Sequence, residues 1–203
     1  MPLPPNLHPD FSSLPWIHQL LTSTDPTLNL SDTHTKTDTY SPPTSASNTL
    51  FATTLANPSS DAIRASLHFT RRCPEPDSIA VSTTPARDAL TPIPTEHCTL
   101  LSLGTGIDGK TSRAHGGFNA LLLDHQLGRT AAVSSASATP ATATMTVDYK
   151  APVVTPGVVL VRAWLVGLEG RKIWVRGVVE DGEGRALAVG KALFLKEKGG
   201  GRI

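Results

Sequence analysis

The chain has 203 residues, of which 39% are hydrophobic and 17% charged, and its formal net charge is +1. This length is enough for one domain with its own core plus an extension. A charge so close to zero excludes the electrostatic signature of a nucleic-acid-binding or membrane-surface protein. The sequence shows no apolar run of about 18 residues, no secretory signal and no Arg-rich presequence. We expect a cytoplasmic protein without a membrane span; a mitochondrial location is the alternative.

The spacing of cysteines and histidines predicts neither a metal site nor a disulfide framework. Cys73 and Cys98 are too few for such a framework, and no pair of the seven histidines has zinc-ligand spacing. The glycines of GTGIDG (104–109) are wrongly spaced for a dinucleotide site, and no G-x-S-x-G nucleophile elbow is present. We therefore expect no metal and no resident cofactor.

The first 48 residues are rich in Pro, Ser and Thr and predict an irregular extension. One short helix is expected within it, near 13–22, with Pro15 in its first turn and Trp16 as the side chain that docks on the domain. Its apolar residues are at helical spacing: Leu14, Ile17 and Leu21.

The domain itself is expected over 49–197, followed by a flexible tail at 198–203. Its first half predicts a hairpin of strands 49–56 and 62–72, a Pro-rich loop and a further strand. A helix is expected over 115–133. Four β-rich runs then predict an antiparallel meander, because two of their connections are short and contain glycine. These runs are 143–152, 157–169, 172–181 and 186–198.

The predicted helix is apolar around most of its circumference, yet it carries a carboxylate, Asp124, in its middle. A helix of this kind is buried on most sides, so we expect Asp124 in a poorly hydrated place where an ionised carboxylate is costly unless it is partnered or used. A structural role, facing solvent or holding an arginine, is the alternative.

His115-Gly116-Gly117 stands at the expected start of this helix. A helix N-terminus presents unpaired N–H groups and a positive dipole, and glycines let a carbonyl approach the backbone closely. Gly117 and Asp124 are seven residues apart, or about 10 Å along one helix at 1.5 Å per residue. If both residues act on one carbonyl, Asp124 must come from a second copy, which predicts a two-fold dimer with composite sites.

HGGFNALLLDHQLG (115–128) resembles the hotdog-fold acyl-CoA thioesterases, in their phenylacetate-type and THEM-like branch. VDYKAPVVTPGVVLVRAWL (147–165) resembles the strands that follow the helix in that family. The likeness covers roughly 95–197, and the extension at 1–48 is similar to those of fungal members. It implies an α+β hotdog fold, in which an antiparallel sheet wraps one long central helix, and a homodimer or dimer of dimers.

The resemblance also implies roles for single residues. Asp124 matches the family's catalytic aspartate, which activates water or attacks the thioester carbonyl directly. Gly117 matches the glycine whose N–H holds the carbonyl oxygen, and His115 matches the histidine that positions the substrate or the loop. A Ser or Thr on the next strand orients the water; Thr142 is preferred by spacing over Thr144.

Coenzyme A enters as part of the substrate, and its phosphates call for basic residues near the helix N-terminus. The expected substrate-binding set combines basic, glycine and apolar residues: Arg113, Lys150, Arg171, Gly116, Phe118, Leu121 and, less directly, Leu122. The sequence departs from the family at Gly109, where many members have an asparagine, and at His125, where many have an acidic residue.

The leading hypothesis is a hydrolase of acyl-CoA or of acyl groups on a carrier protein. A hotdog hydratase or dehydratase is a second reading, although its Asp and His spacing does not match Asp124-His125. A product-releasing enzyme of a biosynthetic pathway and a non-catalytic acyl-CoA-binding protein remain as further alternatives. Acyl length and identity are not encoded in any sequence pattern.

Overall fold

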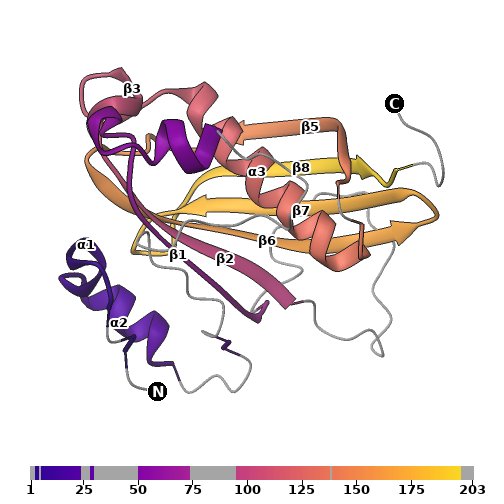
Figure 1. The fold of residues 1–203 in the computed structure, drawn as a ribbon, viewed down its shortest axis with the longest axis horizontal. Helices are drawn as coiled ribbons and strands as arrows, with labels where there is room; N and C mark the ends of the chain where they lie inside the picture. Colours follow the sequence, from indigo (N-terminus) through magenta and orange to yellow (C-terminus); the bar gives the residue numbers. More distant parts are fainter. Residues whose placement is uncertain are drawn as a thin grey trace.

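The protein is built around a six-stranded antiparallel sheet with one long helix, α3 (Gly116–Ser135), packed on one face (Figure 1). The computed structural model describes residues 3–4, 6–23, 28–29, 50–73, 95–137 and 139–197. This arrangement is the hotdog fold, so the predicted fold class is confirmed. None of the helices in the described ranges is long and apolar enough to cross a membrane.

The strands of the sheet lie in the order β1-β2-β6-β7-β8-β5. Their bounds are β1 Ile63–Arg72, β2 Thr95–Leu103, β5 Ala141–Tyr149, β6 Gly157–Glu169, β7 Lys172–Glu180 and β8 Ala186–Leu195. Tight turns join β6 to β7 and β7 to β8, as the Gly-containing connections predict. The prediction of a four-stranded meander is wrong in one respect. β5 pairs with β8 and not with β6, so it forms the edge of the sheet.

The predicted hairpin of 49–56 with 62–72 is also wrong. Leu50–Leu55 forms a π-helical segment, and β1 pairs instead with β2. The ring of Phe51 stacks on the ring of His125 of α3, with centroids 3.9 Å apart. The periodicity of a short apolar run does not distinguish a strand from a helix. In this segment the contact with α3, and not the local pattern, accompanies the helical conformation. The Pro-rich loop at 74–94 and the tail at 198–203 lie outside the described residues.

The sheet is covered on both faces, so its first strands are buried on both sides. On one face, Leu101 and Leu103 of β2 join the core beneath α3. On the other, Cys98 and Leu100 of the same strand meet the N-terminal helices. These are α1 (Pro9–Ser12) and α2 (Pro15–Leu21), and they lie across the sheet from α3 (Figure 1). Strands of this kind have continuous apolar runs, which explains the sequence CTLLSL in β2.

The short helix predicted near 13–22 corresponds to α2, with Pro15 at its first position. Trp16 lies against Gly182 in the β7–β8 turn, as a docking residue should. Trp16 is only partly buried, however, and the fully buried anchors of this layer are Phe11, Ile17 and Leu21. Asp10 adds a polar link, because its Oδ2 accepts a hydrogen bond from the Ser102 hydroxyl at 2.5 Å.

Candidate active site

A small ribbon fixes the position at which α3 begins. It consists of β3 (Asp108–Lys110) and β4 (Arg113–Ala114), which the sequence did not predict. Ala114 donates its N–H to the Val153 carbonyl at 3.0 Å, and His115 donates its N–H to the Ile107 carbonyl at 2.8 Å. The first bond ties the residues before α3 to the segment that follows β5, so the helix N-terminus opens beside the end of that strand, and the second ties them to the residue before β3.

His115 is the N-cap of α3. Its ring folds back over the helix, and Nδ1 accepts the Gly117 N–H at 2.9 Å. The side chain thus satisfies one of the N–H groups that a helix N-terminus leaves unpaired. The N–H that the resemblance assigns to the carbonyl oxygen of a substrate is therefore engaged by a neighbouring imidazole in this structure.

Gly109 lies directly against this imidazole. A Cβ added at 109 would stand 2.9 Å from His115 Cα and 2.9 Å from its Cδ2, which is too close for any side chain. His115 therefore leaves no room at position 109 for the asparagine that many members of the family have there. With no side chain at 109, no polar group reaches the helix N-terminus from there.

Asp124 lies half-buried in the middle of α3, so the expected deep burial is not found in the single chain. Its Oδ1 accepts a hydrogen bond from the Thr142 hydroxyl of β5 at 2.9 Å. Thr142 is the residue that the sequence analysis preferred to Thr144 as the hydroxyl that orients the water, and that role stays a prediction. The expected burial of α3 on most sides is wrong as well, since Val133 is 61% exposed and Leu121 is half-buried.

His125, next to Asp124, lies in a different environment. Burial, and secondarily the positive charge of Arg129, lower the pKa of His125 to about 4. Its ring is stacked on Phe51. Successive residues of a helix project about 100° apart, so His125 points away from the Asp124 carboxylate. An imidazole that is neutral near pH 7 and packed on an aromatic ring is not arranged to act with Asp124 as an acid–base pair.

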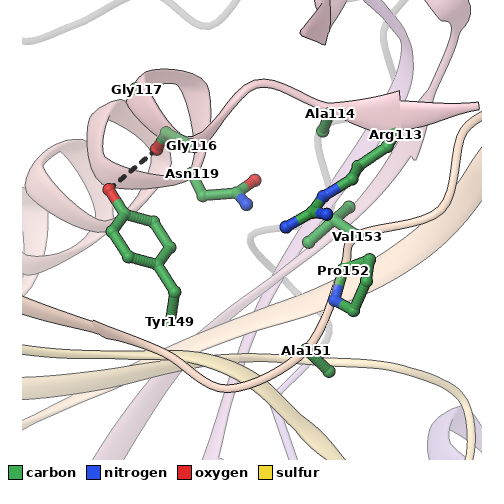
Figure 2. Close-up of a pocket in the computed structure, with 9 residues that line it drawn as sticks. All are labelled: Arg113, Ala114, Gly116, Gly117, Asn119, Tyr149, Ala151, Pro152 and Val153. Atoms are coloured by element: carbon green, nitrogen blue, oxygen red, sulfur yellow. Dashed lines mark hydrogen bonds between the residues drawn. The ribbon is translucent and has the colours of Figure 1, made fainter. Parts of the chain in front are cut away.

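A pocket of about 330 Å³ opens at the N-terminus of α3. Figure 2 shows its lining, which comes from the β4–α3 junction on one side and from the segment after β5 on the other: Arg113, Ala114, Gly116, Gly117, Asn119, Tyr149, Ala151, Pro152 and Val153. The Tyr149 hydroxyl donates to the Gly116 carbonyl at 3.0 Å and joins the two sides. Two of the residues predicted to bind substrate, Arg113 and Gly116, therefore share one cavity with Gly117, the glycine predicted to hold the carbonyl oxygen.

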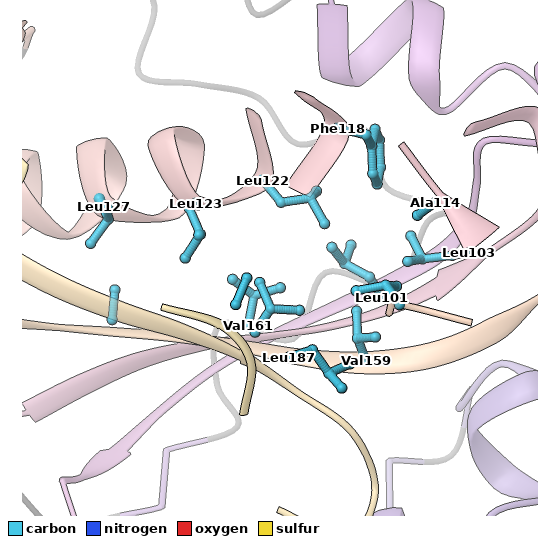
Figure 3. Close-up of a cluster of buried hydrophobic side chains, with 14 of the residues drawn as sticks. Leu101, Leu103, Ala114, Phe118, Leu122, Leu123, Leu127, Val159, Val161 and Leu187 are labelled. Atoms are coloured by element: carbon cyan, nitrogen blue, oxygen red, sulfur yellow. The ribbon is translucent and has the colours of Figure 1, made fainter. Parts of the chain in front are cut away.

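Other predicted binding residues lie elsewhere. Phe118 and Leu122 point into the core beneath α3 and are 8% and 3% exposed (Figure 3). Lys150 is exposed beside the end of β5, with its Nζ 3.9 Å from Asp148 Oδ2. Arg171 lies in the β6–β7 turn and donates to the Lys196 carbonyl. The β6–β7 turn lies at the same end of the sheet as the first residue of β5. The pocket lies at the other end of β5, about 25 Å away for a strand that rises about 3.3 Å per residue. One chain does not bring Arg171 to the pocket.

Two pocket residues with polar side chains, Asn119 and Tyr149, were missed by the sequence analysis. Tyr149 stands directly before Lys150, and the focus on basic residues passed over it. Asn119 lies on the buried face of α3, four residues after His115 and three before Leu122. A polar residue at an otherwise apolar helical position was the available signal, the same one that drew attention to Asp124.

Comparison with known proteins finds a match to part of the chain. Residues 112–188 match the family model of the thioesterase superfamily. The matched segment is less than half of the chain, and it contains Asp124, Gly117, Thr142 and the whole of the pocket lining. A search of curated proteins finds no match.

Several solved structures are similar in fold. A thioesterase superfamily protein is 27% identical with a TM-score of 0.47, over 49% of this chain and 51% of its own. This chain therefore spans about half the length of that protein. Zebra fish thioesterase superfamily member 2 is 14% identical over 53% of this chain and 79% of its own, with a TM-score of 0.48. A hypothetical thioesterase protein from Streptococcus pneumoniae, in a crystal structure with coenzyme A, is 15% identical over 50% of this chain and 80% of its own, with a TM-score of 0.47. Residues 112–188 are thus similar to the thioesterase superfamily, and this segment lies within the sheet and helix described above.

Proposed function

We propose that this protein hydrolyses acyl thioesters, of coenzyme A or of an acyl carrier, with Asp124 as the reacting carboxylate. The observation that carries the proposal is the hydrogen bond from Thr142 to Asp124 Oδ1, inside the segment that matches the thioesterase superfamily. A half-buried carboxylate held in one orientation by a hydroxyl has the form of a general base or nucleophile with its positioning partner.

Two routes are consistent with this pair. In the first, Asp124 takes a proton from a water molecule while the water oxygen attacks the thioester carbon. The C–S bond then breaks, and the leaving thiolate recovers the proton from Asp124. In the second, an Asp124 oxygen attacks the carbon itself and expels the thiolate, and water opens the resulting anhydride. Both routes place negative charge on the carbonyl oxygen, which needs hydrogen-bond donors.

The N-terminus of α3 is the proposed donor site, because its N–H groups and dipole favour a developing negative charge. The Gly117 N–H now donates to His115 Nδ1. We infer that the carbonyl oxygen replaces the His115 ring as the acceptor of this N–H. His115 then acts as a cap that is exchanged for substrate.

The distance between these groups supports a homodimer. Gly117 and Asp124 are about two turns apart on the same helix, or about 10 Å. They can meet one carbonyl only if a second copy supplies one of them. Among the described strands, β5 pairs on one side only, and most of its residues are exposed. A nine-residue open edge is a ready pairing surface, and it carries Thr142 beside Asp124. We propose that two copies pair there as a two-fold dimer.

Coenzyme A, as part of the substrate, would place its phosphates at the exposed mouth of the pocket. Arg113 lines that mouth, and Lys150 directly follows the pocket residue Tyr149. Both cations are exposed, so either can pair with phosphate without first giving up a buried partner.

The test is release of free thiol from a panel of acyl-CoAs. The wild type should release thiol, and Asp124→Asn should lower kcat/KM by orders of magnitude. Asp181→Asn, which keeps the turn-forming acceptor of an unrelated carboxylate, should retain full activity. Undiminished release by Asp124→Asn contradicts the role assigned to Asp124. A strictly monomeric protein in sedimentation removes the composite site. Binding of acyl-CoA without any turnover supports a binding protein instead.

The two routes differ in a single turnover carried out in water enriched in oxygen-18. In the anhydride route, water that attacks the carboxyl carbon of Asp124 leaves the oxygen-18 label in the Asp124 carboxylate. The water route leaves this carboxylate unlabelled. Mass spectrometry of the peptide that contains Asp124 distinguishes them.

A further inference from the structure

One buried oxygen of the protein has no hydrogen-bond partner. It is Oδ1 of Asn119, and Asn119 is only 4% exposed. Within the described ranges, no other buried side-chain nitrogen or oxygen lacks a partner. Buried polar atoms in folded proteins are almost always hydrogen-bonded, so an exception calls for a physical reason.

The other buried polar residues of α3 follow the general rule. Gln126 accepts from the Thr99 hydroxyl and donates to the His97 carbonyl, and Thr130 donates to the Gln126 carbonyl. All three polar residues are on the buried side of the same helix. Only Asn119 lies at the end where the pocket opens, so its lack of a partner coincides with a cavity.

Asn119 lines that pocket, and its side chain points from the first turn of α3 into the space between Tyr149 and Arg113 (Figure 2). The neighbouring hydroxyl is not available as a donor, because Tyr149 donates to the Gly116 carbonyl. The Asn119 side chain therefore borders a space that a ligand can enter, while Oδ1 itself is buried at its edge, and a donor on that ligand that reaches Oδ1 would supply the missing bond.

We propose that Asn119 selects substrates whose acyl group is short and carries a hydroxyl. This proposal rests on the thioesterase function proposed above. The hydroxyl would donate to Asn119 Oδ1 while the thioester carbonyl lies at the α3 N-terminus two residues earlier. A hydroxyl both donates and accepts, so it fits either orientation of the amide.

Burial places the acyl part, and not the thiol arm, beside Asn119. Asn119 is almost fully buried, whereas Arg113, Gly117 and Tyr149 at the mouth are exposed. Coenzyme A carries several negative charges and has to remain near solvent and the cation of Arg113. The acyl group is then the part that reaches inward. A volume of about 330 Å³ is at the small end for ligand pockets, which favours a short chain.

Calorimetric binding of non-hydrolysable thioethers tests this inference without requiring turnover. The probes are S-butyl-CoA and its 2-hydroxy and 3-hydroxy counterparts, measured on the full chain. The wild type should bind at least one hydroxylated probe about tenfold more tightly than S-butyl-CoA. Asn119→Leu, which keeps the branched shape but has no polar atom, should bind the hydroxylated and plain probes within about twofold of each other. Thr130→Val, on the same helix away from the pocket, should keep the wild-type preference.

A merely structural role for Asn119 would weaken all three probes equally in Asn119→Leu and leave their ratio unchanged. That result overturns the inference, as does equal binding of all probes by the wild type or no binding at all. Asn119→Ala provides the same comparison if the leucine variant does not fold. If only the proposed thioesterase function is wrong, the result differs. The wild type would still bind the hydroxylated probe more tightly, but it would hydrolyse neither butanoyl-CoA nor 3-hydroxybutanoyl-CoA.

Discussion

The unpartnered oxygen of Asn119 should cost stability in the protein without ligand. A buried acceptor that has lost water and gained no donor costs about 1–3 kcal/mol, whereas an apolar group of the same shape carries no such penalty. Asn119 borders the core that contains Phe118 and Leu122, so a leucine side chain there finds apolar neighbours. Asn119→Leu should therefore raise the free energy of unfolding by about 1–3 kcal/mol. For a chain of this size, the corresponding rise in Tm is about 2–12 °C.

Thermal and urea denaturation of the ligand-free protein measure this change, with all variants at one protein concentration because dimerisation shifts Tm. Thr130→Val is the matched control. It removes a hydroxyl that is bonded to the Gln126 carbonyl, so it should leave stability unchanged or lower it. A Tm of Asn119→Leu at or below that of the wild type would refute the reasoning. It would mean that Asn119 supports the fold in a way that its contacts do not account for.

Two further predictions concern ionisable groups away from the pocket. Glu96 is fully buried between Arg71 and Arg162. Glu96→Gln removes the carboxylate that pairs with Arg71, while Arg162 keeps its pair with Glu180, and the change should cost about 3–5 kcal/mol in urea denaturation. Glu169→Gln, at an exposed site, should be neutral. The pKa of His125 is about 4 in the folded protein and about 6.5 in the unfolded chain. Between pH 4 and pH 6.5 the unfolded chain therefore binds a proton at His125 that the folded protein does not. Stability should fall as the pH drops from 6.5 to 4, by up to about 1.4 kcal/mol per pH unit, and His125→Gln should flatten that slope. An unchanged slope in the variant would contradict the assigned pKa.

The parts of the fold that sequence predicts are those governed by local pattern. The helix expected over 115–133 is found at Gly116–Ser135, because its leucines repeat at helical spacing after a glycine-flanked cap. β6, β7 and β8 are found where their glycine turns place them. The failures are non-local. No pattern in 49–56 reveals that Phe51 will stack on His125, and nothing in the sequence of β5 indicates that it pairs with β8, which comes three strands later in the chain.

In the candidate site too, the sequence predicts features that depend on local pattern and misses those that depend on the folded arrangement. The types and spacing of residues in HGGFNALLLDHQLG were enough to select Asp124, Gly117 and His115. They did not reveal that His115 Nδ1 occupies the Gly117 N–H, because capping depends on a side-chain rotamer. Asn119 was missed for a related reason. The lack of a hydrogen-bond partner belongs to the folded arrangement, and a single amide in a helix gives no periodic signal.

The two-sided burial of the sheet has a practical consequence for anyone who shortens this protein. The composition of the first 48 residues invites removal of the whole segment before expression, as is customary for leaders rich in Pro, Ser and Thr. α1 and α2, however, form the second layer over β1 and β2. A fragment without them would expose Leu67, Phe69 and Leu100 to water on adjacent strands, a contiguous apolar surface that favours aggregation. The boundary of the folding unit thus lies inside the segment whose composition marks it as dispensable.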